Sequence, residues 1–453
     1  MYFLIRKYPK LFIIKLVIME EKVFKRIIED ELKSLLKQIG CVVIEGPKMS
    51  GKTFLGINHS QSQFYTQELG SQSSVWLHQK GNNPIFDGPK PRLIDEWQLV
   101  PQIWDKVRFL VDQAKGTPGL FILTGSSNAS YELVNHSGAG RMAWLQMQTL
   151  TFSEILTDQA KISLKDLFEQ KPINFVTNQT TFDWMVDQLI KGGWPAVHAQ
   201  VIDATTLVKN YIMSLSKIND TSYDNFNLDP KITLPILRSI ARLNSSQIKL
   251  STILADIDHK ISRETLQKYL LYFKHLFLTF ELSPWISGKK SELDNTSSQF
   301  EFISKAKIRT TPRTYWCDPS IGVYLLGIKT KEKFIQDFNT LGIYFENQVI
   351  KDLLVYAQAL DAQLYFYRDE NNLEVDAIME LADGTWGAIE IKLGSDQAIK
   401  EATKNLLRFS DYIQKRTNKK APAFLLIITA GHLMHAYQQD NGVYVIPHAC
   451  LEC

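Results

Sequence analysis

Residues 46–53 constrain the fold of this chain more than any other segment, because they read Gly-Pro-Lys-Met-Ser-Gly-Lys-Thr without interruption. A short apolar run, 41–44, precedes this octet and another, 54–57, follows it, so the octet lies where a strand should lead into a helix. Gly46 and Gly51 allow the backbone to bend until successive N–H groups face the same anion. The segment therefore predicts a phosphate-binding loop at the positive end of a helix.

A loop of this kind predicts a bound nucleotide, and together with the acids described next it predicts ATP and Mg²⁺ as cofactors. We expect Lys52 to reach the β- and γ-phosphates and the Thr53 hydroxyl to ligate Mg²⁺. A second run, 91–94, ends in Asp95 and Glu96. Asp95 is expected to hold the Mg²⁺ through its water shell, and Glu96 is expected to polarise the attacking water as a general base. As an alternative, the two acids only cap the segment after the strand.

A third apolar run, 119–123, ends in Thr124. Ligands of open parallel sheets lie outside the carboxyl ends of the strands, so Thr124 is placed to sense the γ-phosphate, unless it is an ordinary strand-end threonine. The polar stretch 58–63 is expected to be a loop. The predicted nucleotide-binding set is the whole octet with the first acid: Gly46, Pro47, Lys48, Met49, Ser50, Gly51, Lys52, Thr53 and Asp95.

The order of these motifs, with Gly140-Arg141 after them, resembles the AAA-type ATPases of prokaryotes that carry a C-terminal domain of uncharacterised function. The resemblance covers the chain from about Met19 onward. It continues through Leu150-Thr151-Phe152-Ser153-Glu154, Gly192-Gly193-Trp194-Pro195 and Tyr344-Phe345-Glu346-Asn347. It implies that Arg141 contacts the γ-phosphate or serves as an arginine finger for a neighbouring subunit, although an arginine after glycine could equally be a surface residue.

At 453 residues the chain is too long for one hydrophobic core and should form about three domains. We predict an α/β fold: a P-loop doubly wound parallel sheet, then a helical module, then a C-terminal α/β domain. The expected boundaries are 1–18 for an upstream extension, 19–152 for the ATPase core, 153–227 for a helical lid or connector, 228–290 for the helical module and 306–453 for the C-terminal domain.

Composition excludes several classes of protein. With 45% hydrophobic and 22% charged residues the chain should pack rather than remain disordered. The formal net charge is only +3, so any surface that binds nucleic acid must be local. The four cysteines lack the spacing of a zinc site, and Cys450 and Cys453 are expected to lie in a frayed tail, as reduced thiols of a cytoplasmic protein.

The first eighteen residues are apolar and basic, but Lys15 interrupts them. Their uncharged stretches are far shorter than the roughly twenty residues of a membrane span. No small-residue cleavage site follows. Because the resemblance begins at Met19, we expect translation to start there, and we expect no membrane association.

Three helical segments after residue 228 have the layout of a winged helix-turn-helix, with Ser262 at an N-cap. The third helix carries residues suited to a major groove or to phosphates: Arg263, Gln267, Lys268 and Lys274. The same residues could form the solvated face of a packed helix. The module could also only link the ATPase to the C-terminal domain or bind protein.

A second set of charged residues lies near the C-terminus. Period-two alternation places Glu390 and Lys392 on one face of a strand. Asp376 lies on the neighbouring strand of a hairpin that turns near 383–384, and Glu346, on a preceding helix, is positioned to complete the cluster. This set is similar to the PD-(D/E)XK nuclease fold.

That resemblance implies that Asp376 and Glu390 bind Mg²⁺, that Glu346 supports the site, and that Lys392 orients water or stabilises developing charge. Carboxylate oxygens suit a hard divalent ion, which can activate water and neutralise phosphate together. However, Glu-x-Lys on a strand is also a common surface ion pair, and such folds also serve as binding modules. Arg368 could contact a phosphate or pair with the nearby Glu374.

These patterns predict an ATPase whose catalytic residues are Glu96, Lys52, Arg141 and Thr124, coupled to nucleic-acid binding or cleavage by the C-terminal domain. The alternative is an ATP-dependent protein-interaction switch whose nuclease-like domain is not catalytic. The partners that remain open are DNA, a second copy of the chain and another protein.

Overall fold

The computed structural model describes residues 24–69, 83–126, 138–157, 159, 161–173, 180–215, 228–257, 261–285, 311–417, 419–431 and 435–453. The predicted upstream extension and the predicted start at Met19 lie outside these residues. The chain divides into two compact units: unit 1 comprises 1–157, 191–229 and 275–277, and unit 2 comprises 158–190, 230–274 and 278–453. The segment predicted as a connector, 153–227, is shared between the two units.

Unit 1 is built on a five-stranded parallel sheet in the order β2-β3-β4-β1-β5. Its strands are β1 (Cys41–Glu45), β2 (Ser62–Tyr65), β3 (Arg92–Asp95), β4 (Phe121–Gly125) and β5 (Met142–Gln146). Every residue of β1, β3 and β4 is buried, which is the pattern of parallel strands covered on both faces. The predicted α/β fold of P-loop type is confirmed for this unit.

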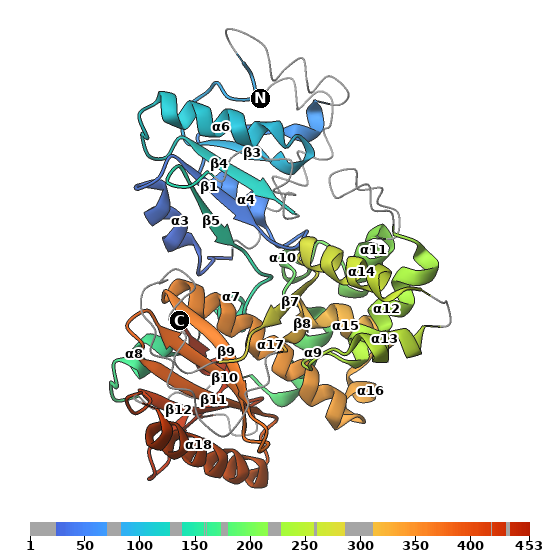
Figure 1. The fold of residues 1–453 in the computed structure, drawn as a ribbon, viewed down its shortest axis with the longest axis vertical. Coiled ribbons are helices and arrows are strands. Elements are labelled where there is room, and N and C mark those ends of the chain that lie inside the picture. Colours follow the sequence, from blue (N-terminus) through green and yellow to red (C-terminus); the bar gives the residue numbers. More distant parts are fainter. Residues whose placement is uncertain are drawn as a thin grey trace. The chain divides into compact units, whose positions relative to one another are not determined.

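Helices cover both faces of this sheet (Figure 1). α6 (Gln102–Gln113) packs on one face, in a core cluster that includes Trp104, Val43 and Ile94. α4 (Lys52–Asn58) packs on the other face, where a Cβ at Gly56 would lie 2.8 Å from Leu93. α3 (Glu29–Leu36) contacts β1.

The later part of unit 1 begins at the Gly192–Pro195 turn and continues as α10 (Pro195–His198) and α11 (Ala204–Leu215). The Leu150 amide donates to Gly193 O at 2.7 Å, and a Cβ at Gly193 would lie only 2.3 Å from Leu150 O. Glycine is therefore required where this segment meets the end of the sheet domain. Trp194 is fully buried and packs against Tyr211, with 5.7 Å between ring centroids.

Unit 2 contains three consecutive helices, α12 (Pro230–Arg242), α13 (Leu250–Asp256) and α14 (Arg263–His275). The Ser262 hydroxyl accepts the Thr265 amide at 3.1 Å, so the predicted N-cap is confirmed. A two-stranded antiparallel sheet of β7 (Thr279–Leu282) and β8 (Arg313–Trp316) follows, and Ser246, between the first two helices, bridges to Thr314 of β8.

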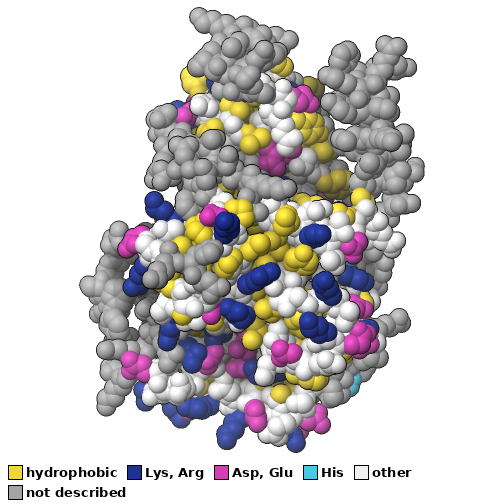
Figure 2. Space-filling view, turned by 90° about the vertical axis from the view of Figure 1, so that its right-hand side faces the viewer, with side chains coloured by type: hydrophobic (Ala, Val, Ile, Leu, Met, Phe, Trp, Pro, Cys, Tyr) yellow, Lys and Arg dark blue, Asp and Glu magenta, His cyan; other side chains and the backbone are white. Residues whose placement is uncertain are grey.

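Three of the four polar residues predicted on the third helix, Arg263, Gln267 and Lys268, are exposed on α14. The fourth, Lys274, pairs with Glu281 of β7 at 2.8 Å, so it serves the local packing. Figure 2 shows Lys and Arg side chains scattered among apolar ones over one face of the molecule.

The remainder of unit 2 is a six-stranded mixed sheet in the order β13-β14-β12-β11-β10-β9. Its strands are β9 (Ala362–Arg368), β10 (Glu374–Leu381), β11 (Trp386–Lys392), β12 (Phe424–Thr429), β13 (Tyr437–Gln438) and β14 (Tyr444–Pro447). β9, β10 and β11 form an antiparallel run, whereas β11, β12 and β14 are parallel. The long helices α17 (Phe338–Ala359) and α18 (Asp396–Arg416) flank this sheet on opposite faces (Figure 1).

Shorter elements complete the two units: η1 (Thr66–Glu68), η3 (Trp97–Leu99), α7 (Phe152–Ile155), β6 (Ile162–Ser163), α8 (Leu164–Phe168), α9 (Phe182–Lys191), α15 (Pro319–Leu325), α16 (Lys331–Ile335), η5 (His448–Cys450) and β15 (Leu451–Glu452). None of the helices within the described parts of the chain combines the length and the apolar character needed to cross a membrane.

Two local predictions are wrong. The end of the stretch predicted as a loop, from Ser62, belongs to β2, because pairing with β3 outweighs the low strand propensity of its polar residues. The C-terminal segment predicted as a frayed tail is ordered: β15 pairs with β6, and Cys450 is fully buried. Long-range pairing decides both cases. All four cysteines are free thiols.

Candidate functional site

The octet 46–53 connects the end of β1 to the start of α4, as predicted. Gly46 has φ 153°, and a Cβ there would lie 2.0 Å from Met147 O, so no other residue fits without moving the backbone. Gly51, at the N-cap of α4, has φ 99°, a left-handed conformation that glycine adopts without strain. The two glycines therefore give the loop its shape.

Lys52 lies over the loop. Its Nζ donates to Gly46 O at 2.9 Å and to Pro47 O at 2.7 Å, and the side chain is buried. Ser50 is buried, whereas Met49 is exposed. The backbone of the loop thus holds the Lys52 ammonium at the position where a loop of this kind binds the phosphates of a nucleotide.

Three oxygen-bearing side chains meet at the carboxyl ends of the strands. Thr53 Oγ1 donates to Asp95 Oδ1 at 2.8 Å, and Thr124 Oγ1 donates to the same oxygen at 2.5 Å. β4 lies between β1 and β3 in the sheet, which brings Thr124 beside Asp95. Burial raises the pKa of Asp95, and the two hydroxyls oppose that rise.

Glu96, the second acid, adopts a left-handed conformation with φ 55° directly after β3. Its Oε2 accepts from Gln98 Nε2 at 2.5 Å and from Ser126 Oγ at 3.0 Å. Non-glycine residues with positive φ are enriched at functional sites, where the surrounding structure holds them. Glu96 also lines the pocket described next.

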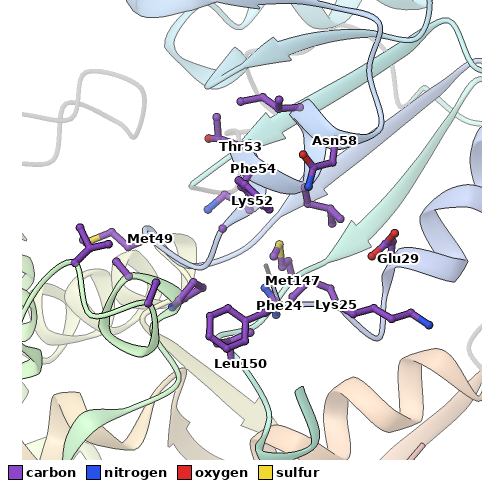
Figure 3. Close-up of a pocket in the computed structure, with 18 of the residues that line it drawn as sticks. Phe24, Lys25, Glu29, Met49, Lys52, Thr53, Phe54, Asn58, Met147 and Leu150 are labelled. Carbon is purple, nitrogen blue, oxygen red and sulfur yellow. The ribbon is translucent and has the colours of Figure 1, made fainter. Parts of the chain in front are cut away.

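A cavity of about 620 Å³ opens beside the loop and is lined by residues of unit 1 alone. Its polar end contains Lys52, Thr53 and Glu96. The rest of its wall is largely apolar: Phe24, Met49, Phe54, Leu55, Ile57, Met147, Leu150, Pro195, Ala196, Ala199 and Val201. Figure 3 shows Lys52 and Thr53 at the start of α4, with Phe24, Met147 and Leu150 across the pocket. A charged end and an apolar wall suit a phosphorylated aromatic ligand.

Arg141 lies at the amino ends of the parallel strands, whereas the phosphate-binding loop lies at their carboxyl ends. Arg141 directly precedes β5, and its carbonyl accepts the amide of Cys41, the first residue of β1. Its side chain is 47% exposed and pairs with Asp112 at 2.8 Å. The loop follows the last residue of β1, about 16 Å away along an extended strand. This position favours a surface role or a contact with another chain over a contact with the nucleotide of the same chain.

The acidic residues predicted near the C-terminus come together in unit 2, at the end of the β10–β11 hairpin away from its turn. Lys392 Nζ lies 3.0 Å from Asp376 Oδ2 and 2.5 Å from Glu390 Oε2. The register of β10 against β9 shifts between Val375 and Ile378, so one extra residue is accommodated there. Such a bulge changes the direction of a side chain, here Asp376, whose Oδ2 also accepts the Ile391 amide at 2.8 Å.

Glu346 of α17 joins the same group through β8. Tyr315 Oη donates to Glu346 Oε1 at 2.8 Å, and Arg313 Nη1 lies 3.5 Å from that oxygen. Arg313 also pairs with Glu374 and lies over the Phe366 ring, 4.5 Å from its centroid. Of the two possibilities for Arg368, the structure shows the pair with Glu374, at 3.3 Å.

The carboxyl groups of this cluster differ in their pKa. Burial raises the pKa of Glu390 to about 8 and that of Glu346 to about 7, and the charge of Asp376 adds to both effects. For Asp376 burial is outweighed by the charges of Lys392 and Arg313, which hold its pKa below the usual value. Of these three carboxyl groups, Asp376 therefore ionises most readily.

A second cavity, of about 750 Å³ and lined by residues of unit 2, opens onto this cluster. Glu346, Asp376 and Lys392 line it, whereas Glu390 is buried behind them and accepts from Asn405 Nδ2 at 2.7 Å. Within the described residues, no group of three or more His, Cys, Asp or Glu side chains is arranged to hold a metal ion. The predicted metal ligands thus lie near one another, with the Lys392 ammonium between two of them.

Several residues of these two sites have no counterpart in the sequence-based prediction, among them Arg26, Glu45, Arg313 and Tyr315. Glu45 ends β1 and is buried, which raises its pKa to about 7. The bonds of Arg26 and of the two β8 residues join positions far apart in the chain, 128 residues for Arg26 and Glu154. Neither the periodicity of apolar residues nor a sequence motif predicts such long-range contacts.

Three family models match separate parts of the chain. The model described as an AAA domain matches residues 39–156. Two models described as domains of unknown function, DUF8612 and DUF4143, match residues 183–332 and 341–451. No curated protein matches the sequence.

Similar solved structures include a Walker-type ATPase of Pyrococcus abyssi, with 13% identity, coverage of 68% of this chain and 97% of that one, and a TM-score of 0.39. DnaA from Aquifex aeolicus with AMPPCP bound has 12% identity, coverage of 55% and 86%, and a TM-score of 0.26. A variant of RuvB from Thermotoga maritima has 14% identity, coverage of 56% and 88%, and a TM-score of 0.26.

These structural likenesses are too low to support an assignment. The assignment rests instead on the AAA match and on the agreement of that match with the loop, the strand order and the acids of unit 1. The chain therefore carries an AAA-type P-loop ATPase domain, followed by two regions that match domains of unknown function.

Proposed function

We propose that this protein hydrolyses ATP with Glu96 as the general base and uses that cycle to control nucleic-acid binding or cleavage in unit 2. The observation that carries the first part is the meeting of Thr53, Thr124 and Asp95 at the carboxyl edge of the sheet, with Glu96 next to them on the pocket wall. Thr53 and Asp95 present hard oxygen donors that fit Mg²⁺. The ion would neutralise phosphate charge, and Lys52 would bind the phosphates.

The hydrogen bonds that hold the Glu96 side chain suit it to act as a general base. Gln98 and Ser126 both donate to Oε2, which leaves the other oxygen to accept a proton from water. Thr66 Oγ1 bonds the carbonyls of Asp95 and Glu96 at 2.8 and 2.7 Å, so the backbone that carries the two acids is held as well. A general base works when it is fixed within hydrogen-bond reach of the proton it removes.

The test is Glu96→Gln, with Glu68→Gln as the matched control because Glu68 is an exposed carboxylate of η1. Glutamine keeps the shape and the hydrogen-bonding capacity but cannot take a proton. We expect turnover to fall by about 10²-fold or more, while the affinity for ATP is kept and an ATP-bound state accumulates. Full turnover in Glu96→Gln would remove the base assignment.

The second part of the proposal concerns unit 2. The order α17, β9, β10, β11, α18, β12, with acids at the end of a β-hairpin beside a cavity, supports the PD-(D/E)XK-like fold. Asp376 and Glu390 would hold Mg²⁺ with Glu346 in support, and the ion would activate water and neutralise phosphate. Their donors are all oxygens, as that ion requires. Lys392 would then exchange its carboxylate partners for the phosphate or the attacking water.

The order of α12, α13, α14 and the β7–β8 sheet, with exposed Arg263, Gln267 and Lys268, supports the winged-helix-like module as a surface for nucleic acid. β8 also carries Tyr315, which contacts Glu346 of the acidic cluster. β8 lies in the predicted C-terminal domain and pairs with β7 of the predicted module. DNA bound at the module would therefore lie on a part of unit 2 that is hydrogen-bonded to the strand that carries Tyr315.

The experiment is Mg²⁺-dependent cleavage of labelled single- and double-stranded DNA, with and without ATP, by wild type and by Asp376→Ala. Asp411→Ala, which removes an exposed acid of α18, is the matched control. Cleavage that is lost only in Asp376→Ala supports the nuclease assignment. Intact DNA in every lane would instead support the alternative, an ATP-dependent protein-interaction switch, which the neutralised Lys392 cluster also permits.

A further inference from the structure

Arg26 lies beside the phosphate-binding loop, in the segment that precedes α3, and is only 6% exposed. Its Nη1 donates to Ser50 O at 2.9 Å and its Nη2 donates to Gln148 O at 2.7 Å. Its Nε donates to Glu154 Oε1 at 3.0 Å. A single planar guanidinium therefore joins the loop, the segment after β5 and α7. The fixed fork of donors makes this arrangement specific to arginine.

The bond to Ser50 acts on the loop through peptide geometry. In a trans peptide the carbonyl of one residue and the N–H of the next point in opposite directions. By holding Ser50 O on its own side, Arg26 directs the Gly51 N–H to the other side. Phosphate binding in such loops depends on the direction of successive N–H groups. Arg26 thus controls the orientation of a peptide group in the middle of the loop.

Glu154, the acidic partner of Arg26, cannot move independently. It is 2% exposed, its Oε1 also accepts the Ile27 amide at 2.8 Å, and its Oε2 accepts the Thr151 amide at 2.9 Å. The Thr151 hydroxyl in turn accepts the Glu154 amide at 3.1 Å, which completes a capping box at the start of α7. A displacement of Arg26 would therefore be passed to the first turn of α7.

The contacts continue from this turn to the segment after Gly192. Leu150, next to Thr151, donates its amide to Gly193 O at 2.7 Å. On the other side of Arg26, the Phe24 ring meets His198 of α10 edge-on, with 6.2 Å between centroids. Pro195, Ala196, Ala199 and Val201 form part of the wall of the cavity beside the loop. The Arg26 segment thus contacts both the loop and this wall.

We propose that Arg26 is a positioning residue for the nucleotide, which sets the orientation of the loop at Ser50 and transmits its state to the segment 192–201. The proposal goes beyond hydrolysis at Glu96, and it rests on the loop being the nucleotide site. Arg26 does not need to touch the reacting atoms. Its effect is on nucleotide affinity and on the response of α10 to the nucleotide.

The experiment compares full-length wild type with Arg26→Gln, Arg26→Lys, Glu154→Gln and the control Lys37→Gln, which removes an exposed charge from the turn after α3. Three quantities are measured: the dissociation constant of ATP, kcat and KM for hydrolysis, and amide hydrogen exchange over 194–201 with and without saturating ATP.

We expect Arg26→Gln to weaken ATP binding by about tenfold or more, and to lose the ATP-dependent protection of 194–201 even at saturation. The ATP affinity and the protection of Arg26→Lys should lie between those of wild type and Arg26→Gln, since an ammonium cannot hold three divergent acceptors at once. Glu154→Gln should keep much of the affinity and lose the protection, and Lys37→Gln should match wild type.

Wild-type affinity together with normal protection in a folded Arg26→Gln would overturn the proposal. So would normal protection at saturating ATP in both Arg26→Gln and Glu154→Gln, because Arg26 would then only support the fold. If wild type itself fails to bind ATP, it is the ATPase proposal that fails. Loss of binding in Lys52→Ala, with wild-type affinity and normal protection in Arg26→Gln, would refute only the present inference.

Discussion

Each unit places a lysine ammonium in its candidate site, and the two lysines have different kinds of partner. In unit 1, Lys52 Nζ donates to the carbonyl oxygens of Gly46 and Pro47, at 2.9 and 2.7 Å. In unit 2, Lys392 Nζ lies 3.0 Å from Asp376 Oδ2 and 2.5 Å from Glu390 Oε2. Carbonyl oxygens are neutral acceptors and leave a lysine its charge, whereas carboxylates cancel it.

The two sites therefore differ in how readily they can accept an anionic ligand. The loop of unit 1 offers a positive charge to an anion, and a phosphate there would replace the carbonyl oxygens of Gly46 and Pro47 as acceptors from Lys52. The charge of Lys52 also acts on the carboxyl groups of Glu45 and Asp95. The cluster of unit 2 is balanced within itself, and a ligand there must first compete with ion pairs. Removing Lys52 should therefore mainly lower the affinity of unit 1 for its ligand, whereas removing Lys392 should mainly lower the stability of unit 2.

The largest effect is expected for Lys52→Ala. The variant loses charge-assisted bonds to the phosphates, so we expect ATP affinity to fall by about 10- to 100-fold. The melting temperature without nucleotide should change less than the affinity, because the hydrogen bonds lost to Gly46 and Pro47 are bonds to neutral backbone carbonyls of the loop. Isothermal titration with ATP and calorimetric melting measure the two quantities, with Lys37→Ala as the control. A large loss of stability with affinity preserved would reverse the comparison.

The next effect is expected for Lys392→Met, which keeps the length of the side chain and removes its charge. Asp376 and the buried Glu390 would lose their common partner, so the free energy of unfolding of unit 2 should fall by about 1–3 kcal/mol. The side chain is 31% exposed, and water therefore moderates the loss. ATP affinity should be unchanged. Lys415→Met, at a pair that is 72% exposed on its lysine side, is the control. Equal melting of the two variants would contradict the expectation.

The next prediction concerns how the stability of unit 2 depends on pH. The folded pKa values of Glu390, about 8, and Glu346, about 7, lie above the ordinary value of 4.5, so the folded state holds more protons between those limits. Stability from these two groups is fully present below pH 4.5 and is lost as the pH rises through 7 and 8. The lowered pKa of Asp376 has the opposite sign and is felt only in acid.

Hydrogen exchange of the β10 and β11 amides between pH 5.5 and 8.5, corrected for intrinsic exchange rates, measures this dependence. We expect the free energy of opening to fall as the pH rises, by about 1.4 kcal/mol for each pH unit over which a group is protonated in the folded state alone. Glu390→Gln should flatten the curve. A flat curve in wild type would show that the cluster does not hold protons in this range.

The smallest effect is expected for Arg141→Ala. Arg141 is exposed, and its bond to Asp112 is a surface pair, so the stability should change by no more than about 1 kcal/mol. Because it lies at the amino end of β5, turnover of the isolated chain should equal that of wild type. Turnover is measured over a range of protein concentrations, with Arg108→Ala as the control. A loss that appears only where copies associate would assign Arg141 to a neighbouring site as an arginine finger.

Much of unit 1 could be predicted from the sequence because its motifs are local. The loop, the strand before it and the helix after it are contiguous, and each acid directly follows a buried apolar run. The hairpin of β10 and β11 was predictable for the same reason, since alternation along a strand and a nearby turn place Glu390, Lys392 and Asp376 together. The polar strand β2 and the ordered C-terminal strand β15 were not, because their evidence is a partner elsewhere in the chain.

The residues that could bind a phosphate follow from the sequence alone, because a glycine, a lysine and a threonine within one turn are brought together by local backbone geometry. The residues that surround them depend on the tertiary fold. Because the strands are parallel, Arg141 lies at their amino ends, whereas the loop lies at their carboxyl ends. The strand order places Thr124 within hydrogen-bond distance of Asp95, and Arg26 donates a hydrogen bond to Ser50 O. Those contacts join residues that share no turn or strand, and they form only when the whole sheet has assembled.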